Sequence, residues 1–218
     1  SLLRFVLSVL GVAMYCVLNA QNAEIGSDRK FKIVQFTDVH WVSGSEHSVV
    51  SEKCMNRVLD EEKCLTLLFF PGDFVTGKPA QNGLEEVLKP TVSRGIPFAM
   101  TFGNHDDEQG LSREELFELY GKYKGNLTET TPGISGVTNY TLTLKSHDGD
   151  NDAAVLYIFD SNSYSPLKSL DSYDWIKRDQ INWYADRSKA FKAANGGSSL
   201  PSLAFLPYSV AEYNEAAR

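Results

Sequence analysis

Three short polar segments of the chain carry residue types that bind metal ions and transfer protons: Asp38-Val39-His40, Gly72-Asp73 and Gly103-Asn104-His105-Asp106. Each segment follows an apolar run that suits a buried strand of an α/β sheet. The runs are Phe31–Phe36, Leu65–Phe70 and Ile96–Phe102. Ligands of such sheets bind outside the carboxyl ends of the strands, so two aspartates, an asparagine and two histidines would meet at one edge. Oxygen and imidazole ligands with open positions suit a pair of hydrolytic divalent metal ions.

The spacing of the segments fits successive strand–helix–strand units, because 35 and 31 residues separate Asp38, Asp73 and Asn104. A lone aspartate after a strand is more often a turn residue or a helix cap, but three such segments at this spacing favour one shared site. Helices are predicted at Ser51–Lys63, at Gly83–Arg94 with a kink or restart at Pro90, and from a capping box at Ser112 to about Tyr123. The alternation predicts a parallel sheet with crossover helices.

The second half of the chain has a different pattern. Strands are predicted at Val137–Lys145, Ala153–Phe159 and Ser202–Leu206, and a helix at Ser209–Arg218. Asp171 is a candidate N-cap for a long helix in which Trp175, Trp183 and Tyr184 would pack into the core. Neither a repeat nor a linker composition divides the chain, so we expect one α/β domain over residues 30–218.

The composition limits the class of partner. The formal net charge is −7 and the pI is about 5.1, so the chain has no basic field for sequence-independent binding of nucleic acid. An acidic site would repel a phosphorylated substrate unless bound cations reversed the local charge. The acidic balance fits a metalloenzyme, although many acidic proteins bind neither metal nor phosphate.

The N-terminus has the pattern of a targeting segment. Arg4 precedes the apolar stretch Phe5–Leu18, and the small residue Ala20 follows. This stretch is short for a bilayer span and typical of a signal peptide, so residues 1–20 are interpreted as a cleaved signal, with an uncleaved membrane anchor or a buried helix as alternatives. The sequons at Asn126 and Asn139 agree with a secreted glycoprotein. Contact with a membrane is expected only if the N-terminal segment stays uncleaved.

The remaining cysteines and histidines carry little functional signal. Cys54 and Cys64 could pair in an oxidising compartment, but one helix would hold them about 15 Å apart, which favours two free buried thiols. His47 is expected in a polar loop and His147 in a turn, both solvated. None of these residues has the spacing of a zinc cluster.

The motifs together resemble the calcineurin-like metallophosphoesterases, a family that includes the purple acid phosphatases. The resemblance rests on Phe36-Thr37-Asp38-Val39-His40, on Pro71-Gly72-Asp73-Phe74-Val75-Thr76-Gly77 and on Gly103-Asn104-His105-Asp106-Asp107-Glu108. A longer likeness over residues 171–189 and 212–215 points to the small, single-domain branch of purple-acid-phosphatase-like enzymes. The resemblance implies an αββα sandwich, here without the C-terminal strands of the family, with residues 30–218 as its N-terminal and central part.

The resemblance also implies roles for individual residues. Asp38 and His40 would hold a first metal ion, Asp73 would bridge two ions, and Asn104 would bind the second. His105 would be the catalytic general acid toward the leaving alkoxide, with Asp106 a candidate to orient it. Two cations a few ångströms apart lower the pKa of a bridging water. The resemblance implies that this water hydrolyses phosphate monoesters on small molecules or phosphoproteins.

Three departures from the family pattern affect the metal site. Thr76 stands where coloured purple acid phosphatases have a tyrosine, so the metal could be iron, manganese or zinc. Pro207 stands where the family has a histidine ligand. The closing Gly-His-x-His motif is absent up to Arg218. The alternative expectation is therefore a non-catalytic or truncated phosphoesterase-like protein with an impaired metal site.

Overall fold

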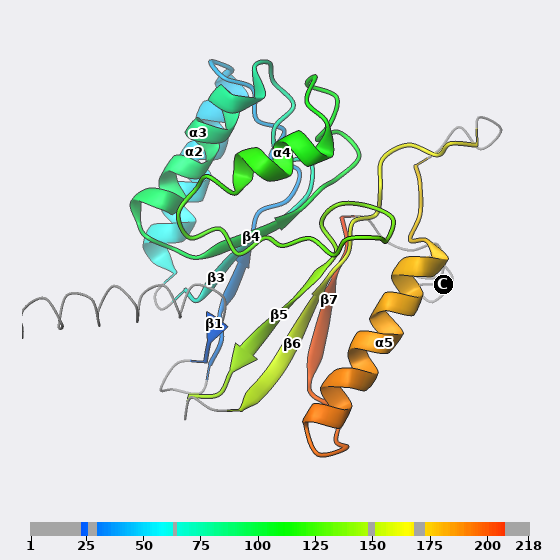
Figure 1. Cartoon of the computed structure of the whole chain (residues 1–218). Coiled ribbons are helices and arrows are strands. Elements are labelled where there is room, and N and C mark those ends of the chain that lie inside the picture. Colours follow the sequence, from blue (N-terminus) through cyan, green and yellow to red (C-terminus); the bar gives the residue numbers. More distant parts are fainter. Residues whose placement is uncertain (1–22, 26–29, 63–64, 148–150, 168–172, 208–218) are drawn as a thin grey trace, which may run out of the picture.

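The computed structural model describes residues 23–25, 30–62, 65–147, 151–167 and 173–207. Its elements in chain order are β1 (Ala23–Glu24), β2 (Ile33–Gln35), α2 (Glu46–Glu61), β3 (Leu67–Pro71), α3 (Ala80–Ser93), β4 (Phe98–Thr101), α4 (Arg113–Tyr120), β5 (Tyr140–Lys145), β6 (Asp152–Ile158), α5 (Arg178–Ala194) and β7 (Ser202–Phe205). Figure 1 shows two sheets, with α2, α3 and α4 on the outer side of one and α5 on the outer side of the other. The predicted α/β class and four-layer αββα order are confirmed.

The three apolar runs form one parallel sheet, as the sequence predicts. β3 lies between β2 and β4, with Val34 beside Leu68 and Phe69 beside Ala99. Both crossovers contain a helix, α2 or α3, so all three strands end at the same edge. This edge is where the three polar segments emerge.

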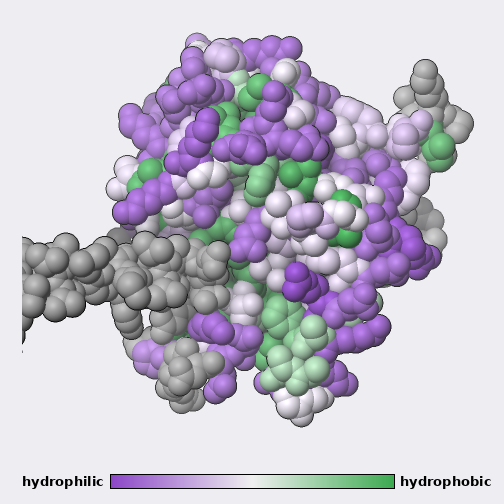
Figure 2. All heavy atoms as spheres, in the orientation of Figure 1, coloured by the Kyte–Doolittle hydropathy of each residue, from purple (hydrophilic) through white to green (hydrophobic). Residues whose placement is uncertain are grey.

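Side chains of β3 alternate between two cores. Leu68 and Phe70 pack into the core under α2, α3 and α4. The face of these helices that Figure 2 shows is mostly hydrophilic, with scattered hydrophobic residues. Leu67 and Phe69 point the other way and pack against the second sheet. Burial on both faces explains why this strand is apolar throughout.

Two helix boundaries differ from the prediction. α2 begins at Glu46 rather than Ser51, because the Ser45 hydroxyl accepts the backbone N–H groups of His47 and Ser48 and caps the helix. The predicted loop at His47 is therefore wrong, although its predicted exposure is confirmed. The structure assigns α3 as continuous through Pro90, without the restart that the sequence suggested.

The capping box that opens α4 is confirmed. The Ser112 hydroxyl accepts the backbone N–H of Glu115 at 3.2 Å, and the Glu115 carboxylate accepts the backbone N–H of Ser112 at 2.8 Å. The helix ends at Tyr120 and not at the predicted Tyr123, since Gly121 occupies its C-cap.

The second sheet has the order β1-β5-β6-β7. β5 and β6 are antiparallel neighbours, and β7 runs parallel to β6 with Ile158 beside Phe205. Along β6, Leu156 faces the core between the sheets, whereas Val155 and Tyr157 face α5. The predicted strands of this half are confirmed, with ends shifted by a few residues.

α5 begins later than predicted. Its N-cap is Lys177, while the expected cap, Asp171, lies outside the described residues. Trp175 therefore precedes the helix and is exposed, with the Lys177 ammonium 3.5 Å from its ring centroid, so its predicted core packing is wrong. Trp183 is buried against β6 as predicted, whereas Tyr184 is exposed beside the Tyr157 ring, so its predicted core packing is wrong.

The cysteine and histidine expectations have mixed outcomes. Cys54 is free, as predicted, but exposed on α2, so the expectation of a buried thiol is wrong there. Cys64 lies outside the described residues. His147 is exposed in a turn, as predicted.

The two sequons occupy different environments. Asn139 is fully buried, and its side-chain oxygen accepts hydrogen bonds from the Asp160 backbone N–H and from the Gln180 amide. This side chain is a structural element of the fold and is not presented to solvent. Asn126 is half-buried, and its side-chain oxygen accepts the backbone N–H of Thr128.

Both predicted terminal segments lie outside the described residues: the signal peptide or anchor at residues 1–20 and the helix at Ser209–Arg218. Within the described ranges, the helices are all too short or too polar to cross a bilayer.

Candidate metal centre

The polar segments after β2 and β3 are joined along their backbones beyond the ends of the strands. The Asp38 N–H donates to the Gly72 carbonyl at 3.3 Å, and the His40 N–H donates to the Asp73 carbonyl at 2.9 Å. The pairing continues to an isolated parallel bridge between Trp41 and Val75. These bonds bring the first two motifs together.

Asp38, His40 and Asp73 form a group that could hold a metal ion. One ligand atom from each lies within 4.8 Å of the others, and His40 Nε2 is 4.0 Å from Asp73 Oδ2. Asp38 and His40 are exposed, while Asp73 is buried. The donor atoms therefore meet where solvent and a ligand can reach them.

The same three residues have left-handed backbone conformations. Their φ angles are 53° at Asp38, 46° at His40 and 51° at Asp73. Such conformations cost residues other than glycine about 1–3 kcal/mol each and concentrate at functional sites. The fold thus holds strained backbone at the three positions that the sequence selects as ligands.

The third segment, after β4, closes tightly on the second. A Cβ on Gly103 would lie 2.2 Å from Asp73 Oδ1, and one on Gly72 would lie 2.6 Å from the Gly103 nitrogen. The His105 N–H donates to Asp73 Oδ1 at 2.9 Å. Asn104 and His105 are thereby placed beside Asp73, as the motif spacing predicts.

The Asp106 side chain binds the backbone where the second and third segments meet, and it does not lie beside the imidazole of His105. Its buried carboxylate accepts three backbone N–H groups, from Asp73 at 2.9 Å, Phe74 at 2.7 Å and Gly103 at 2.8 Å. Burial raises the pKa of Asp106 and the charge of Asp73 adds to the shift, although the N–H groups of Gly103 and Phe74 and the charge of Arg113 oppose it. The predicted role of Asp106 in orienting His105 is therefore not what the structure shows: Asp106 joins two loops.

Glu108 is the carboxylate that contacts His105. His105 Nδ1 is 2.9 Å from Glu108 Oε2, and the His105 ring is 5.4 Å from the His40 ring between centroids. The hydrogen bond to Glu108 raises the pKa of His105 above its ordinary value; desolvation opposes this, and the charge of Asp73 adds to it. The imidazole thus lies between a carboxylate and the candidate metal ligands.

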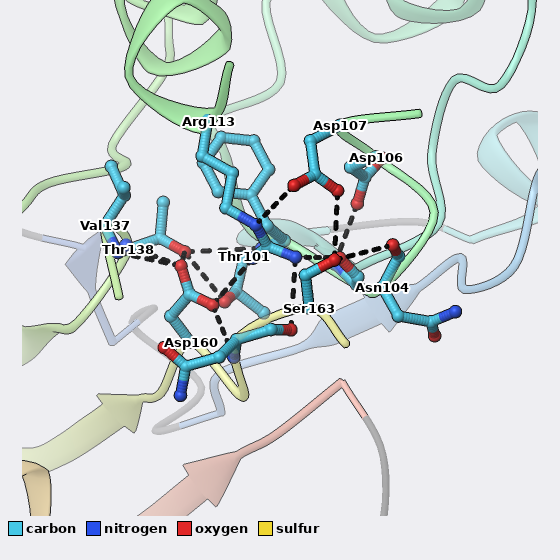
Figure 3. Close-up of polar contacts among 12 residues, drawn as sticks. Thr101, Asn104, Asp106, Asp107, Arg113, Val137, Thr138, Asp160 and Ser163 are labelled. Carbon is cyan, nitrogen blue, oxygen red and sulfur yellow. Dashed lines mark hydrogen bonds and ion pairs between the residues drawn. The ribbon is translucent and has the colours of Figure 1, made fainter. Parts of the chain in front are cut away.

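Arg113 of α4 ties the third segment to the loop after β6. Its buried guanidinium donates to Asp160 Oδ1 at 2.8 Å, to the Gly103 carbonyl at 2.5 Å and to the Asn162 carbonyl at 3.1 Å. Arg113 Nε is also 3.5 Å from Asp107 Oδ2. Figure 3 shows this guanidinium at the centre of the polar contacts.

Asp160 completes this network from the second sheet. Its other carboxylate oxygen accepts the backbone N–H of Val137 at 2.8 Å and of Thr138 at 3.3 Å (Figure 3). A buried carboxylate needs a cation and several donors to offset its desolvation, and Arg113 and these N–H groups supply them. The network connects the segment after β4 in the first sheet to the segment after β6 in the second sheet, next to the candidate metal centre.

Comparison with known proteins agrees with this geometry. Residues 31–206 match the calcineurin-like phosphoesterase family. The chain belongs to this family. The resemblance noted in the sequence is thus confirmed over most of the chain.

Several curated proteins are similar to this chain. Phosphatase DCR2 of Saccharomyces cerevisiae is 33% identical over 89% of this chain and 37% of its own length. Two proteins of Arabidopsis thaliana are named probable inactive purple acid phosphatases: number 14 is 27% identical over 96% of this chain and 64% of its own, and number 29 is 28% identical over 91% and 59%. The chain therefore spans between about a third and two thirds of the length of these relatives.

The residues of the phosphoesterase site fit the metal ions that its family implies. Oxygen and imidazole donors converge from the ends of β2 and β3 with an exposed side. Asn104 is buried, and its side-chain nitrogen makes no hydrogen bond of standard geometry among the described residues. This NH2 group can donate to a phosphate oxygen but cannot bind a metal ion, for which the ligand atom of Asn104 would be its side-chain oxygen.

Pro207 limits this fit. Its Cβ lies 3.2 Å from the place of a Cβ on Gly72, so the end of β7 reaches the edge where Asp73 lies. The position that the family pattern gives to a histidine is thus at the site, but proline supplies no ligand atom from its side chain.

Sequence reasoning did not assign several residues around this site. Glu108 lies within the third motif, and its spacing of three residues from His105 could have indicated a contact between the two side chains. Arg113 and Asp160 come from α4 and the end of β6, 47 residues apart, and no local pattern connects them.

Proposed function

We propose that this phosphoesterase hydrolyses phosphate monoesters at the site formed by the three motif segments. The observation that carries the proposal is the meeting of Asp38, His40 and Asp73 in strained conformations, with ligand atoms within 4.8 Å. The yeast relative named a phosphatase supports it. Two ions of iron, manganese or zinc, when bound, would supply an activated water and neutralise charge on the phosphate.

The metal ligands would divide between the two positions. Asp38 and His40 would hold the first ion, Asp73 would bridge both, and Asn104 would bind the second. A neutral amide at Asn104 leaves net positive charge for the incoming phosphate, which a carboxylate there would cancel.

His105 would act as the general acid. It lies beside Asp73, and the hydrogen bond to Glu108 raises its pKa, which favours the protonated ring that would donate to the leaving alkoxide oxygen. No other described histidine is placed for this step, since His40 belongs to the metal group and His47 and His147 lie in α2 and in a turn.

A second candidate function is a phosphoesterase-like protein without catalysis. Pro207 at the edge of the site favours it, because it leaves Asp73 and Asn104 as the described ligands of the second ion. The Arabidopsis relatives named probable inactive agree with it.

The expected substrates are phosphorylated small molecules or phosphoproteins, with phosphodiesters as an alternative for the same chemistry. The net charge of −7 supports a partner other than nucleic acid. We propose a secreted or secretory-pathway location, supported by the apolar stretch after Arg4 and the sequon at Asn126, with membrane contact only if residues 1–20 remain attached.

The proposal is tested by metal analysis together with hydrolysis. Elemental analysis should find metal in the purified protein, and an aryl phosphate monoester should be cleaved faster than a diester with iron, manganese or zinc present. His40→Ala should lose metal and activity, whereas the matched control His47→Ala, on an exposed helix turn, should lose neither. A protein that binds no metal and cleaves neither ester would establish the non-catalytic alternative.

A further inference from the structure

We propose that Tyr164 is a positioning residue of this site, which holds Glu108 against the His105 ring and so determines which imidazole nitrogen faces the substrate. The inference rests on the proposed function for the role of His105. It concerns a residue from the loop after β6, outside the three motif segments.

The contacts form a short chain of hydrogen bonds. The Tyr164 hydroxyl donates to Glu108 Oε1 at 2.5 Å, and Glu108 Oε2 is 2.9 Å from His105 Nδ1. The Tyr164 hydroxyl is also 3.4 Å from His105 Nδ1, and the two rings meet edge-on at 6.4 Å. Because Glu108 engages Nδ1, the other ring nitrogen, Nε2, is left for the leaving group.

The backbone before Tyr164 is strained in the same way as that of the candidate ligands. Asn162 has a φ of 65°, and it is the single non-glycine residue with positive φ in the described ranges besides Asp38, His40 and Asp73. Three of these four residues belong to the metal group, and the fourth directs the chain toward His105. Strain of this kind persists only where surrounding contacts impose it.

Those contacts surround Asn162. Its N–H donates to Asp160 Oδ1 at 2.9 Å, its carbonyl accepts from Arg113 at 3.1 Å, and its side-chain amide donates to the Trp175 carbonyl at 3.0 Å. Arg113 also binds the Gly103 carbonyl. One guanidinium thus sets the position of the His105 segment and of the Tyr164 segment together.

Ser163 provides a direct contact between the two segments. Its hydroxyl is 3.2 Å from the Asn104 carbonyl and 3.3 Å from Asp107 Oδ1 (Figure 3). Beyond it, Tyr164 forms an antiparallel bridge with Tyr173, and their rings lie 5.7 Å apart. The tyrosine is therefore fixed from both sides.

Core packing does not account for this arrangement. The Tyr164 side chain is about half exposed, at 48%, so water could satisfy its hydroxyl without any bond to Glu108. The strained backbone and the buried Arg113–Asp160 pair hold an exposed ring against an exposed carboxylate. A role for the ring at the imidazole explains why the fold keeps it there.

The first test reads the imidazole without metal or substrate. Long-range ¹H–¹⁵N spectra of the metal-free protein at pH 9 report the tautomer of each of the four histidines. We expect His105 as the Nδ1–H tautomer, a shift toward Nε2–H in Tyr164→Phe, and a larger shift in Glu108→Ala. Glu108→Gln keeps an acceptor oxygen and should restore part of the Nδ1–H form.

Matched controls separate positioning from general damage to the fold. Tyr184→Phe removes a hydroxyl from another partly exposed tyrosine, on α5, and should leave the His105 tautomer unchanged. His47 and His147 should keep their signals in every variant. A His105 tautomer that is identical in the wild type, Tyr164→Phe and Glu108→Ala would overturn the proposal.

The second test uses hydrolysis. Tyr164→Phe should lower kcat for alkyl phosphates by about three- to tenfold with KM unchanged, the rate equivalent of one net hydrogen bond. In a His105→Ala background, Tyr164→Phe should not lower kcat further. A merely structural role of Tyr164 would lower kcat in the wild-type background and in the His105→Ala background alike. Failure of the proposed function would appear as absence of hydrolysis in the wild type, and the tautomer measurement would then still decide the role of Tyr164.

Discussion

The carboxylate of Asp106 holds the backbone of Asp73, a residue 33 positions earlier in the chain, through a hydrogen bond of 2.9 Å from the Asp73 N–H to Oδ2. Asp73 is the candidate ligand shared by both metal positions, and its left-handed backbone needs external support. The same carboxylate also accepts from Phe74 and Gly103. Asp106 therefore stabilises the backbone of the site and does not contact a substrate.

Asp106→Asn should destabilise the protein by about 1–3 kcal/mol, the cost of leaving a buried donor without an acceptor. The asparagine keeps the shape but has one acceptor oxygen, so its NH2 group would face at least one of the three N–H groups. Urea unfolding measures the loss. Asp186→Asn, on the exposed surface of α5, is the control and should change the free energy of unfolding by less than about 0.5 kcal/mol.

Gly103→Ala should destabilise the protein and weaken metal binding together. The new Cβ would lie 2.2 Å from Asp73 Oδ1 and 2.6 Å from the Asp73 nitrogen, so the ligand or the loop must move. Overpacking of this kind costs about 1–3 kcal/mol. Thermal unfolding and metal titration measure the two effects.

Gly121→Ala provides the comparison for this substitution. Gly121 has an ordinary helical backbone, with φ of −59°, and a Cβ there would meet nothing closer than 3.5 Å. It should leave metal binding unchanged and stability equal or slightly higher. Equal damage from both alanines would show that close approach at Gly103 is not the cause.

The Asp179 carboxylate, at the start of α5, should make the free energy of unfolding depend on pH. Burial raises its pKa, but hydrogen bonds from the Ser135 N–H and hydroxyl and from the Gln180 N–H outweigh this, so the pKa lies below its ordinary value. A lowered pKa means that the carboxylate stabilises the fold above the unfolded pKa of about 3.9 and loses this contribution as pH falls through the folded pKa.

Asp179→Asn should therefore cost stability at pH 7 and cost progressively less below pH 4. Urea unfolding of both proteins across this range gives the difference. A penalty that stays constant with pH would mean that the shape of the side chain and not its charge holds Ser135.

The first sheet could be predicted because its signals are local and agree with one another. Each apolar run ends in a polar motif, and the helix between successive runs forces the strands to be parallel. The capping box at Ser112 was equally readable. The start of α5 was not, because Lys177 is an unusual N-cap and carries no sequence signal.

The candidate ligands could be predicted as a set, but the groups that hold them could not. Asp106 is next to His105 in sequence, which suggested that it orients the imidazole, whereas the turn directs it toward the backbone of Asp73. Glu108, three residues after His105, is the carboxylate that contacts the imidazole. Left-handed conformations at Asp38 and His40 are likewise invisible in the sequence, and both residues donate backbone hydrogen bonds to a segment more than 30 residues away.

Asn104 and His105 lie in one turn but should fail differently in the metal-loaded protein. Asn104→Ala removes an oxygen ligand, so occupancy of the second metal position should fall, as elemental analysis will measure. His105→Ala leaves the ligands in place and removes a proton donor. It should lower turnover of alkyl phosphates by about 10²–10⁴-fold with metal content unchanged.

The leaving group decides whether His105 is the acid. An aryl oxide is a good leaving group that needs no proton, so His105→Ala should slow aryl phosphates far less than alkyl phosphates. A residue that only positions substrate would slow both equally, because the same phosphate is bound in each case. Equal losses for the two ester classes, or loss of metal from His105→Ala, would assign this histidine to binding or ligation instead of proton transfer.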